Sequence, residues 1–171
     1  GEEISLHTPA DVRGLFDTFL ADEIRRANPD NLPDGRLFRR SSVDIVSPSQ
    51  KTIHRGSYSE EEIVRDMEKA LAILHEEQIP LLHRIAIFHY LFGYIHPFYD
   101  GNGRMSRFIT TYFLAREFHP TVALQLSLLI KKRRAKYYKL FAETTSAHNC
   151  GDLTPFIRGT LRFIHAAIDY T

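Results

Sequence analysis

The pattern of hydrophobic and polar positions along the chain is predominantly that of α-helices. Between residues 81 and 95 almost every position is apolar, aromatic or histidine, which indicates a helix buried on most of its sides. Apolar residues recur at helical spacing in several other stretches, and Pro, Gly or capping residues mark their ends. The expected helices run from Thr8 or Asp11 to about Ala27, over 60–78 after an N-cap at Ser59, over 81–95, from the end of a glycine-rich loop to the break at 118–120 with apolar spacing from Phe108, over 121–149 as a split pair, and over 153–169.

Residues 37–56 depart from this helical pattern. Val43, Ile45 and Val46 precede a Ser-Pro-Ser-Gln turn at 47–50, and Thr52 and Ile53 follow it, which predicts a short β-hairpin. A lone two-stranded hairpin is marginally stable and leaves an exposed edge. The predicted fold class is therefore all-α, a helical bundle that carries one short hairpin.

Composition limits the classes of protein that this chain can represent. Its 171 residues suit one domain, and a net charge of +1 gives no global basic field for nucleic acid. The run Lys-Lys-Arg-Arg at 131–134 is interpreted as a solvated helix face. A single cysteine, Cys150, excludes an internal disulfide framework and suits a reducing cytoplasm. No apolar run is long enough to span a membrane, and GEEISLH is not a signal peptide. We expect a cytoplasmic protein with neither a nucleic-acid nor a membrane partner.

The stretch HPFYDGNGRMSR, residues 96–107, interrupts the helices with a glycine-rich turn. The start of the next helix presents unpaired N–H groups and the positive end of the helix dipole, so it favours anions. Gly101 and Gly103 are expected to allow backbone conformations closed to other residues, so that N–H groups converge on an anion. Arg104 and Arg107, three residues apart, share one helix face and are suited to gripping a polyphosphate.

Three further side chains of the stretch complete a chemical site. Asp100 is suited to a Mg²⁺ ion that bridges it to the phosphates, although a helix cap is the structural alternative. His96 is suited to taking a proton from a hydroxyl nucleophile. The side chain of Asn102 is suited to forming hydrogen bonds within the loop. For Arg107, a structural ion pair is the alternative to phosphate binding. Together these residues predict a phosphoryl or nucleotidyl transfer site.

The same stretch resembles, at every defined position, the signature of the Fic-domain family, His-x-Phe-x-(Asp or Glu)-Gly-Asn-Gly-Arg-x-x-Arg. RLFRRSSVDIV resembles the family's segment before the catalytic core, where a β-hairpin flap lies over the site. KYYKLF (136–141) and GDLTPFIRGTLRFI (151–164) resemble its closing helices. The resemblance divides the chain into an N-terminal helix and connection (1–36) and a Fic domain (37–168), with the flap at about 39–56 and the catalytic loop at 96–107.

The resemblance implies a protein adenylyltransferase, which transfers AMP from ATP to a Ser, Thr or Tyr hydroxyl of a target protein with Mg²⁺. His96 would be the base and Asp100 would hold Mg²⁺ on the phosphates. The remaining motif positions would bind the nucleotide: Gly101, Asn102 and Gly103 as the anion hole, Arg104 on the outer phosphates, and Arg107 in support of the site.

Positions outside the motif are assigned from the same resemblance. The flap would bind the target's main chain by strand addition, with Ile53 and His54 near the modified side chain. Tyr137 or Tyr138 would line the adenine pocket, with a role in the core as the alternative.

Other activities on the same scaffold stay open at this point. A related, Doc-like branch transfers phosphate and has Lys at the position of Gly103; UMP transfer, phosphocholine transfer and a non-catalytic nucleotide-binding module are further alternatives. Many Fic proteins carry an inhibitory pattern, (Ser or Thr)-x-x-x-Glu-(Gly or Asn), which Ser57 to Glu62 matches except at the last position. We therefore expect any inhibitory antitoxin or inhibitory segment to lie outside this chain.

Overall fold

The protein is analysed through a computed structural model, in which residues 3–46 and 52–170 are described. The fold is all-α with one two-stranded antiparallel hairpin, which confirms the predicted fold class. The described residues form helices α1 (Pro9–Phe19), α2 (Ala21–Ala27), α3 (Glu60–Leu74), α4 (Leu81–Ile95), α5 (Asn102–Glu117), α6 (Pro120–Lys132), α7 (Arg134–Thr145) and α8 (Thr154–Asp169), strands β1 (Asp44–Val46) and β2 (Thr52–Arg55), and 3₁₀ turns η1 (Pro29–Asn31) and η2 (Ala147–Asn149).

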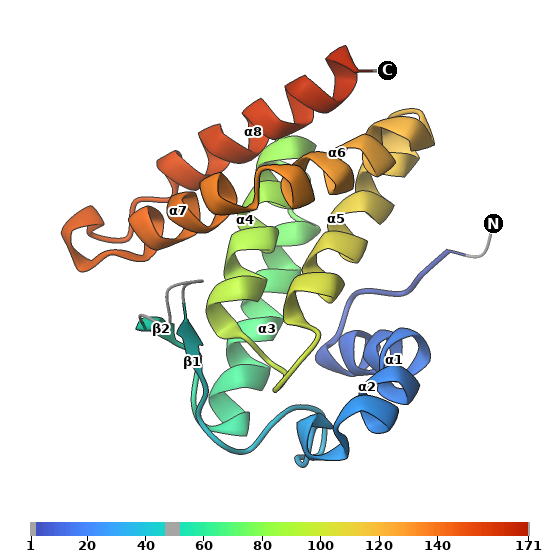
Figure 1. Ribbon diagram of the computed structural model, residues 1–171, viewed down its shortest axis with the longest axis vertical. Helices are drawn as coiled ribbons and strands as arrows, with labels where there is room; N and C mark the ends of the chain where they lie inside the picture. Colours follow the sequence, from blue (N-terminus) through green and yellow to red (C-terminus); the bar gives the residue numbers. More distant parts are fainter. Residues whose placement is uncertain (1–2, 47–51, 171) are drawn as a thin grey trace.

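Helix α4 lies at the centre of the bundle (Figure 1). It packs against α3, α5 and α8, and α6 packs against α5 and α8. Helices α1 and α2 lie at the end of the bundle where the chain turns from α4 into α5 (Figure 1). This arrangement places the turn between α4 and α5 at one end of the molecule.

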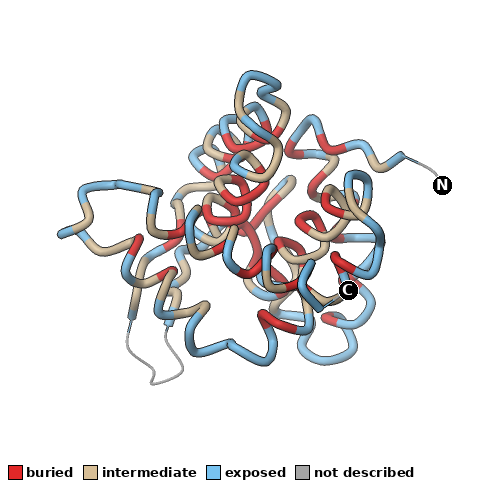
Figure 2. Tube along the Cα trace, turned by 90° about the horizontal axis from the view of Figure 1, so that it is seen from above, coloured by how far each residue is buried: buried red, intermediate tan, exposed pale blue. Residues whose placement is uncertain are grey.

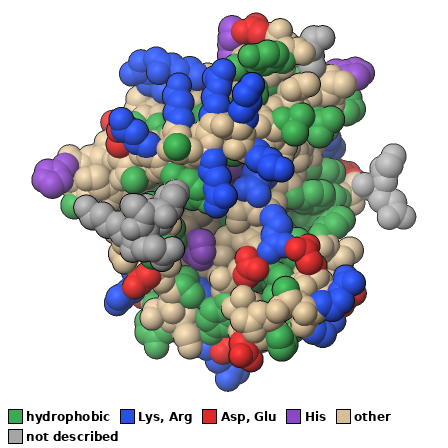
Figure 3. Space-filling model, in the orientation of Figure 1, with side chains coloured by type: hydrophobic (Ala, Val, Ile, Leu, Met, Phe, Trp, Pro, Cys, Tyr) green, Lys and Arg blue, Asp and Glu red, His purple; other side chains and the backbone are tan. Residues whose placement is uncertain are grey.

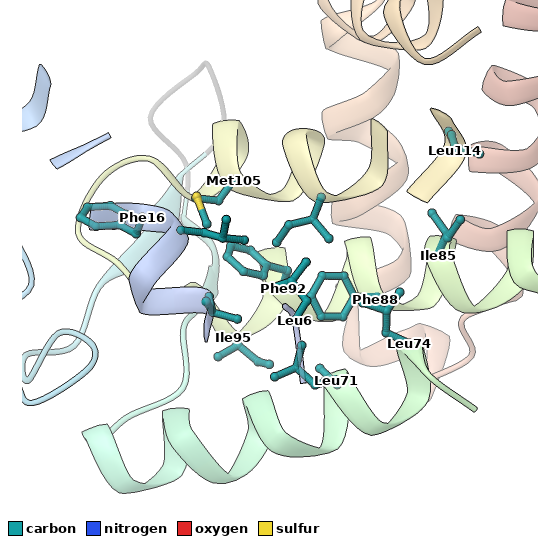
Figure 4. Packing of buried hydrophobic residues seen from close by; sticks show 14 of the residues in the cluster. Leu6, Phe16, Leu71, Leu74, Ile85, Phe88, Phe92, Ile95, Met105 and Leu114 are labelled. Carbon is teal, nitrogen blue, oxygen red and sulfur yellow. The ribbon is translucent and has the colours of Figure 1, made fainter. Parts of the chain in front are cut away.

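The hydrophobic core is built around the apolar faces of α4. Phe88, Phe92 and Ile95 of α4 lie among side chains from α1, α3 and α5 (Figure 4), and all three are at most 2% exposed. The buried positions follow the inner sides of the helices in Figure 2. Phe98, in the turn after α4, is fully buried and stacks on Phe16 with ring centroids 4.1 Å apart. The turn is therefore anchored in the core by an aromatic pair.

The first predicted helix and the one predicted over 60–78 have different bounds in the structure. The expected helix up to Ala27 breaks at Leu20, where α1 ends and α2 begins, and this lets Ile24 of α2 bury its side chain. Thr8 is the N-cap, and Asp11 completes a capping box with it. Helix α3 ends at Leu74 instead of residue 78, because the chain continues as a hydrogen-bonded turn up to Ile79, which precedes a proline.

The hairpin pairs β1 with β2, with Ile45 opposite His54 and Val46 opposite Thr52. Ile53 is thus the extra residue of a β-bulge. The predicted turn at 47–50 lies outside the described residues. The hairpin lies beside α4 in Figure 1, and β2 also contacts α7.

The stretch 121–149 is split, as expected, with Arg133 between α6 and α7. Ser59 occupies the N-cap position of α3, but its hydroxyl donates to Glu61 and does not cap the helix. Among the described residues, no helix combines the length and the hydropathy that crossing a membrane requires.

Candidate functional site

The turn from α4 into α5 depends on Gly101. Its φ of +89° lies in the left-handed region that favours glycine, and a Cβ there would meet Leu20 Cδ1 at 2.8 Å. Helix α5 begins directly afterwards, at Asn102. The expected special conformation of Gly103 is wrong, because Gly103 is helical and lies within the first turn of α5. Its missing side chain instead lets the Arg107 guanidinium approach this turn, since a Cβ would lie only 3.1 Å from Nη1 of Arg107.

The first turn of α5 is a donor site for an anion. The backbone N–H groups of Asn102, Gly103 and Arg104 have no acceptor among the described residues. The Asn102 side chain braces the turn, since its Oδ1 accepts from the Phe98 N–H at 3.0 Å and its Nδ2 donates to the Phe98 carbonyl at 2.8 Å. Only the backbone of Asn102 therefore remains available to a ligand.

A cleft of about 720 Å³ opens over this helix start, and Figure 3 shows a hollow there in which one histidine is visible among Lys and Arg side chains. It brings together nine of the predicted site residues: His96, Asp100, Gly101, Asn102, Gly103, Arg104, Arg107, Tyr137 and Tyr138. Tyr99, Leu124, Ser127, Leu128, Ile130, Lys131 and Arg134 complete the lining.

The cleft lining is strongly cationic. Arg104, Arg107, Lys131 and Arg134 line it together with one carboxylate, Asp100. Lys131 and Arg134 belong to the basic run that the sequence assigned to a solvated helix face; they are exposed, but they also face this cleft. The spacing of the four basic residues at 131–134 does not show which of their side chains point toward α5. The charge of the lining suits a ligand with several negative charges.

Two carboxylates bind the guanidinium of Arg104. Its Nη1 donates to Oε1 of Glu23 at 2.7 Å, and its Nη2 donates to Oδ2 of Asp100 at 3.1 Å. The other oxygen of Asp100 accepts the Gly101 N–H at 2.5 Å. Glu23 belongs to α2 and was not foreseen, because nothing in its surrounding sequence links it to a residue 81 positions away.

Glu23 occupies a donor of Arg104 that a phosphate bound in the cleft would need. We expect Glu23→Gln to tighten nucleotide binding about two- to fivefold, the worth of one partly exposed ion pair. Isothermal titration with ATP measures this. Asp22→Asn is the matched control on the same helix, because Asp22 pairs with Arg25 and does not touch the cleft. Weaker binding in Glu23→Gln would contradict competition and make Glu23 a support for Arg104.

His96 has a conformation and a tautomer suited to a base. It ends α4 with a φ of 53°, and its Nδ1 lies 3.3 Å from the Gly93 carbonyl oxygen. Because a carbonyl only accepts, this bond requires the proton on Nδ1, which leaves the Nε2 lone pair free in the neutral ring. Burial is the main cause that lowers the pKa of His96 to about 4; the positive charges of Arg39 and His54 act in the same direction.

The low pKa of His96 predicts the acidic side of the pH–rate profile. A base is active when deprotonated, so activity falls as pH drops through its pKa. We expect kcat/KM to stay level from pH 7 to about pH 5 and to fall toward pH 4. A histidine with its ordinary pKa, about 6.5, would already lose half of its activity near pH 6.5. A fall of that kind would contradict a base buried in this way.

Arg39 holds the turn after α4 and the two ends of the hairpin together, and it was not predicted as a site residue. Its side chain is fully buried. The guanidinium donates to the carbonyl oxygens of His96 at 2.8 Å, Ser41 at 2.6 Å, Ser57 at 2.7 Å and Ile95 at 3.3 Å. The bonds join three separate segments of backbone around the base.

Ile53 and His54, predicted to bind the target, do not line the cleft. The His54 ring stacks on Tyr94 with centroids 3.8 Å apart, and its Nε2 lies 3.1 Å from the Tyr94 carbonyl oxygen. Ile53 packs on a small cluster that includes Phe141 and Phe156. Their role in target binding stays a prediction.

Tyr137 is tied to the core through a buried histidine. His89 lies 2.8 Å from the Tyr137 hydroxyl through Nε2 and 2.7 Å from Thr110 Oγ1 through Nδ1. The Thr110 hydroxyl donates to the Ser106 carbonyl, so His89 Nδ1–H donates to Thr110 and Nε2 accepts from Tyr137. Burial lowers the pKa of His89 to about 4 and raises the pKa of Tyr137, so both side chains are neutral.

The site suits a metal only together with a ligand. The described residues contain no group of three or more His, Cys, Asp or Glu side chains that would hold a cation by themselves. Mg²⁺ commonly uses one or two carboxylates and takes its other ligands from phosphates and water. Asp100, beside the unpaired N–H groups of α5, fits that pattern.

One cleft thus combines cationic side chains and unpaired backbone N–H groups with a neutral histidine. The family model for the Fic/DOC family matches residues 11–114. The chain therefore belongs to the Fic/DOC family.

Curated relatives share part of the chain. It is 39% identical to "Protein adenylyltransferase Fic" of Drosophila erecta over 88 residues, which cover 50% of this chain and 16% of the relative. It is 33% identical to the protein of the same name from Drosophila melanogaster over 125 residues, or 73% of this chain and 23% of the relative. The chain thus spans about a fifth of the length of these relatives.

A solved structure shares the fold. A Fic family protein from Desulfovibrio desulfuricans superposes with a TM-score of 0.75 at 26% sequence identity. The match covers 96% of this chain and 46% of the other chain. The helical bundle described here is therefore a Fic fold.

Proposed function

We propose that this chain is a protein adenylyltransferase that transfers AMP from ATP to a Ser, Thr or Tyr hydroxyl of a target protein. The observation that carries the proposal is one cleft that contains both the unpaired N–H groups at the start of α5 and His96 with its free Nε2. The names of the curated relatives support this activity.

The proposed reaction is an in-line displacement at the α-phosphorus of ATP. His96 Nε2 takes the proton of the attacking hydroxyl while its oxygen forms a bond to that phosphorus. The bond from the α-phosphorus to the bridging oxygen breaks, and pyrophosphate leaves with the bonding electrons. The product is the target with AMP in a phosphodiester link.

The other cleft residues bind and orient the nucleotide. The first-turn N–H groups of α5 and the guanidinium groups of Arg104 and Arg107 would stabilise the negative charge on the phosphates. Asp100 would hold Mg²⁺, which when bound neutralises phosphate charge and favours pyrophosphate as a leaving group. Tyr137 and Tyr138, at the wall formed by α7, would contact the base.

Gly103 supports AMP transfer over the phosphate transfer of the Doc-like branch. The family's phosphate-transferring members resemble this loop but have Lys at this position. In this chain, the position carries no side chain, and a Cβ added to it would have the Arg107 guanidinium as its nearest neighbour, at 3.1 Å. A side chain here would therefore crowd the Arg107 guanidinium, whereas glycine lets that guanidinium lie against the first turn of α5, where it would contact the phosphates of a nucleotide whose α-phosphorus faces His96.

The test is incubation of the purified chain with Mg²⁺ and a lysate, using ATP labelled at the α- or the γ-phosphate. Label from the α-position alone, with one AMP added per modified site by intact mass, would establish AMP transfer. Label from the γ-position would assign the chain to phosphate transfer. The same assay with labelled UTP, GTP and CTP tests the other nucleotides, and absence of any transfer would overturn the proposal.

A further inference from the structure

A second groove, with a volume of about 680 Å³, runs between α7 and α8 and shares no lining residue with the cleft. Its lining is Arg133, Lys136, Lys139, Leu140, Glu143, Asp152, Thr154, Pro155, Arg158, Gly159, Arg162 and Phe163. Lys and Arg side chains gather over α7 and α8 in the upper left of Figure 3.

The groove is basic, although the chain as a whole carries a charge of only +1. Five of its residues are Lys or Arg and two are acidic. Lys139 pairs with Glu143 at 3.7 Å. The other four cations have exposed side chains without an ion pair or hydrogen bond to the described residues: Arg133, Lys136, Arg158 and Arg162. Unpaired like charges along one groove attract an anionic partner.

The helix packing gives this groove a fixed shape. A Cβ on Gly159 would clash with Leu140, so the missing side chain lets Leu140 of α7 rest directly on α8. Leu140 and Pro155 supply apolar surface between the charged groups of the lining. A groove of this kind suits an extended chain that carries both charges and short apolar groups.

The groove and the cleft lie on two sides of the same helix. Arg134, Tyr137 and Tyr138 of α7 face the cleft, whereas Lys136 and Leu140 face the groove. A helix with its side chains is about 10 Å across. A polypeptide bound in the groove is therefore within reach of the cleft by a few residues of extended chain.

We propose that the α7–α8 groove binds an acidic segment of the target protein. The proposal rests on the proposed function, because it assumes that the substrate is a protein. The lining favours a polypeptide over a nucleic acid: it contains two carboxylates, and its one aromatic side chain, Phe163, is 5% exposed and offers no ring for base stacking.

Binding of a labelled peptide tests the groove separately from catalysis. The probe is a fluorescent twelve-residue peptide of alternating Glu and Ser, titrated with the chain in the absence of nucleotide and followed by anisotropy. We expect Arg158→Glu combined with Arg162→Glu to weaken binding at least tenfold. His96→Asn should bind the peptide like the original chain, so loss of transfer and loss of docking are told apart.

The matched control is Arg65→Glu combined with Lys69→Glu, which makes the same charge change on the exposed face of α3. It should retain the affinity within about twofold. Equal loss in the control, or no binding by the original chain at low salt, would overturn the proposal. The proposal would also be overturned if a twelve-nucleotide single strand bound more tightly than the peptide and if Arg158→Glu combined with Arg162→Glu abolished that binding. The groove would then be a nucleic-acid site. Thermal melting of each variant checks that it is folded.

Discussion

His96→Asn should lower the rate of transfer by about two to four orders of magnitude, the usual contribution of a general base. The substitution removes the Nε2 lone pair that would take the hydroxyl proton. Asparagine is the suitable replacement because His96 has a positive φ, which asparagine tolerates better than alanine. Single-turnover transfer from α-labelled ATP measures the loss.

Nucleotide binding provides the control for this variant. The phosphate-binding groups belong to α5 and stay in place, so ATP affinity should change less than about threefold and the melting temperature by a few degrees. Retained binding with lost transfer distinguishes an enzyme from a nucleotide-binding module, in which His96 would be dispensable. If His96→Asn retained most of the transfer activity, the proposed mechanism would be wrong.

Arg39→Met should destabilise the fold by about 3 kcal/mol or more, because it removes four hydrogen bonds made by a fully buried guanidinium and leaves the buried Ile95 carbonyl without this donor. The lost bonds join the carbonyls of Ile95 and His96 to the backbone on either side of the hairpin. We also expect transfer to fall, since the turn that positions His96 loses its support. Urea unfolding followed by circular dichroism measures the change in free energy.

The neighbouring Arg40 offers a matched control for Arg39, because it carries the same side chain and is exposed. Arg40→Met should change the free energy of unfolding by less than about 0.5 kcal/mol. Equal losses in the two variants would show that Arg39 contributes no more than a surface charge. Arg39→Lys should be almost as unstable as Arg39→Met, since an ammonium group cannot reproduce the planar fork of donors.

The sequence allowed prediction of those elements that are determined by residues close together in the chain. Helix α4 was predicted because its apolar residues are continuous. The site at 96–107 was predicted because its glycines, its aspartate and its arginines lie within twelve positions. The break at Leu20 was missed because no Gly or Pro marks it; it arises from the packing of α2 on the core.

The missed site residues act over long distances in the sequence. Arg39 bonds to a carbonyl 57 positions away, and Glu23 to an arginine 81 positions away. A single arginine or glutamate has no periodicity or spacing that reveals such a partner. Lys131 and Arg134 face the cleft because α6 packs on α5 and α7 follows directly from α6, and this too is decided by tertiary structure.

The hydrogen bond between Tyr137 and His89 limits which residues of the cleft can be replaced without loss of stability. Any replacement of Tyr137 that lacks a hydroxyl leaves a buried imidazole nitrogen without its donor, at a cost of about 1–3 kcal/mol. Leu124 and Leu128, on the same cleft, are 60% and 50% exposed and carry no such penalty. Variation among natural homologues, and libraries that select for another nucleobase, should therefore accumulate on α6 while this tyrosine stays invariant.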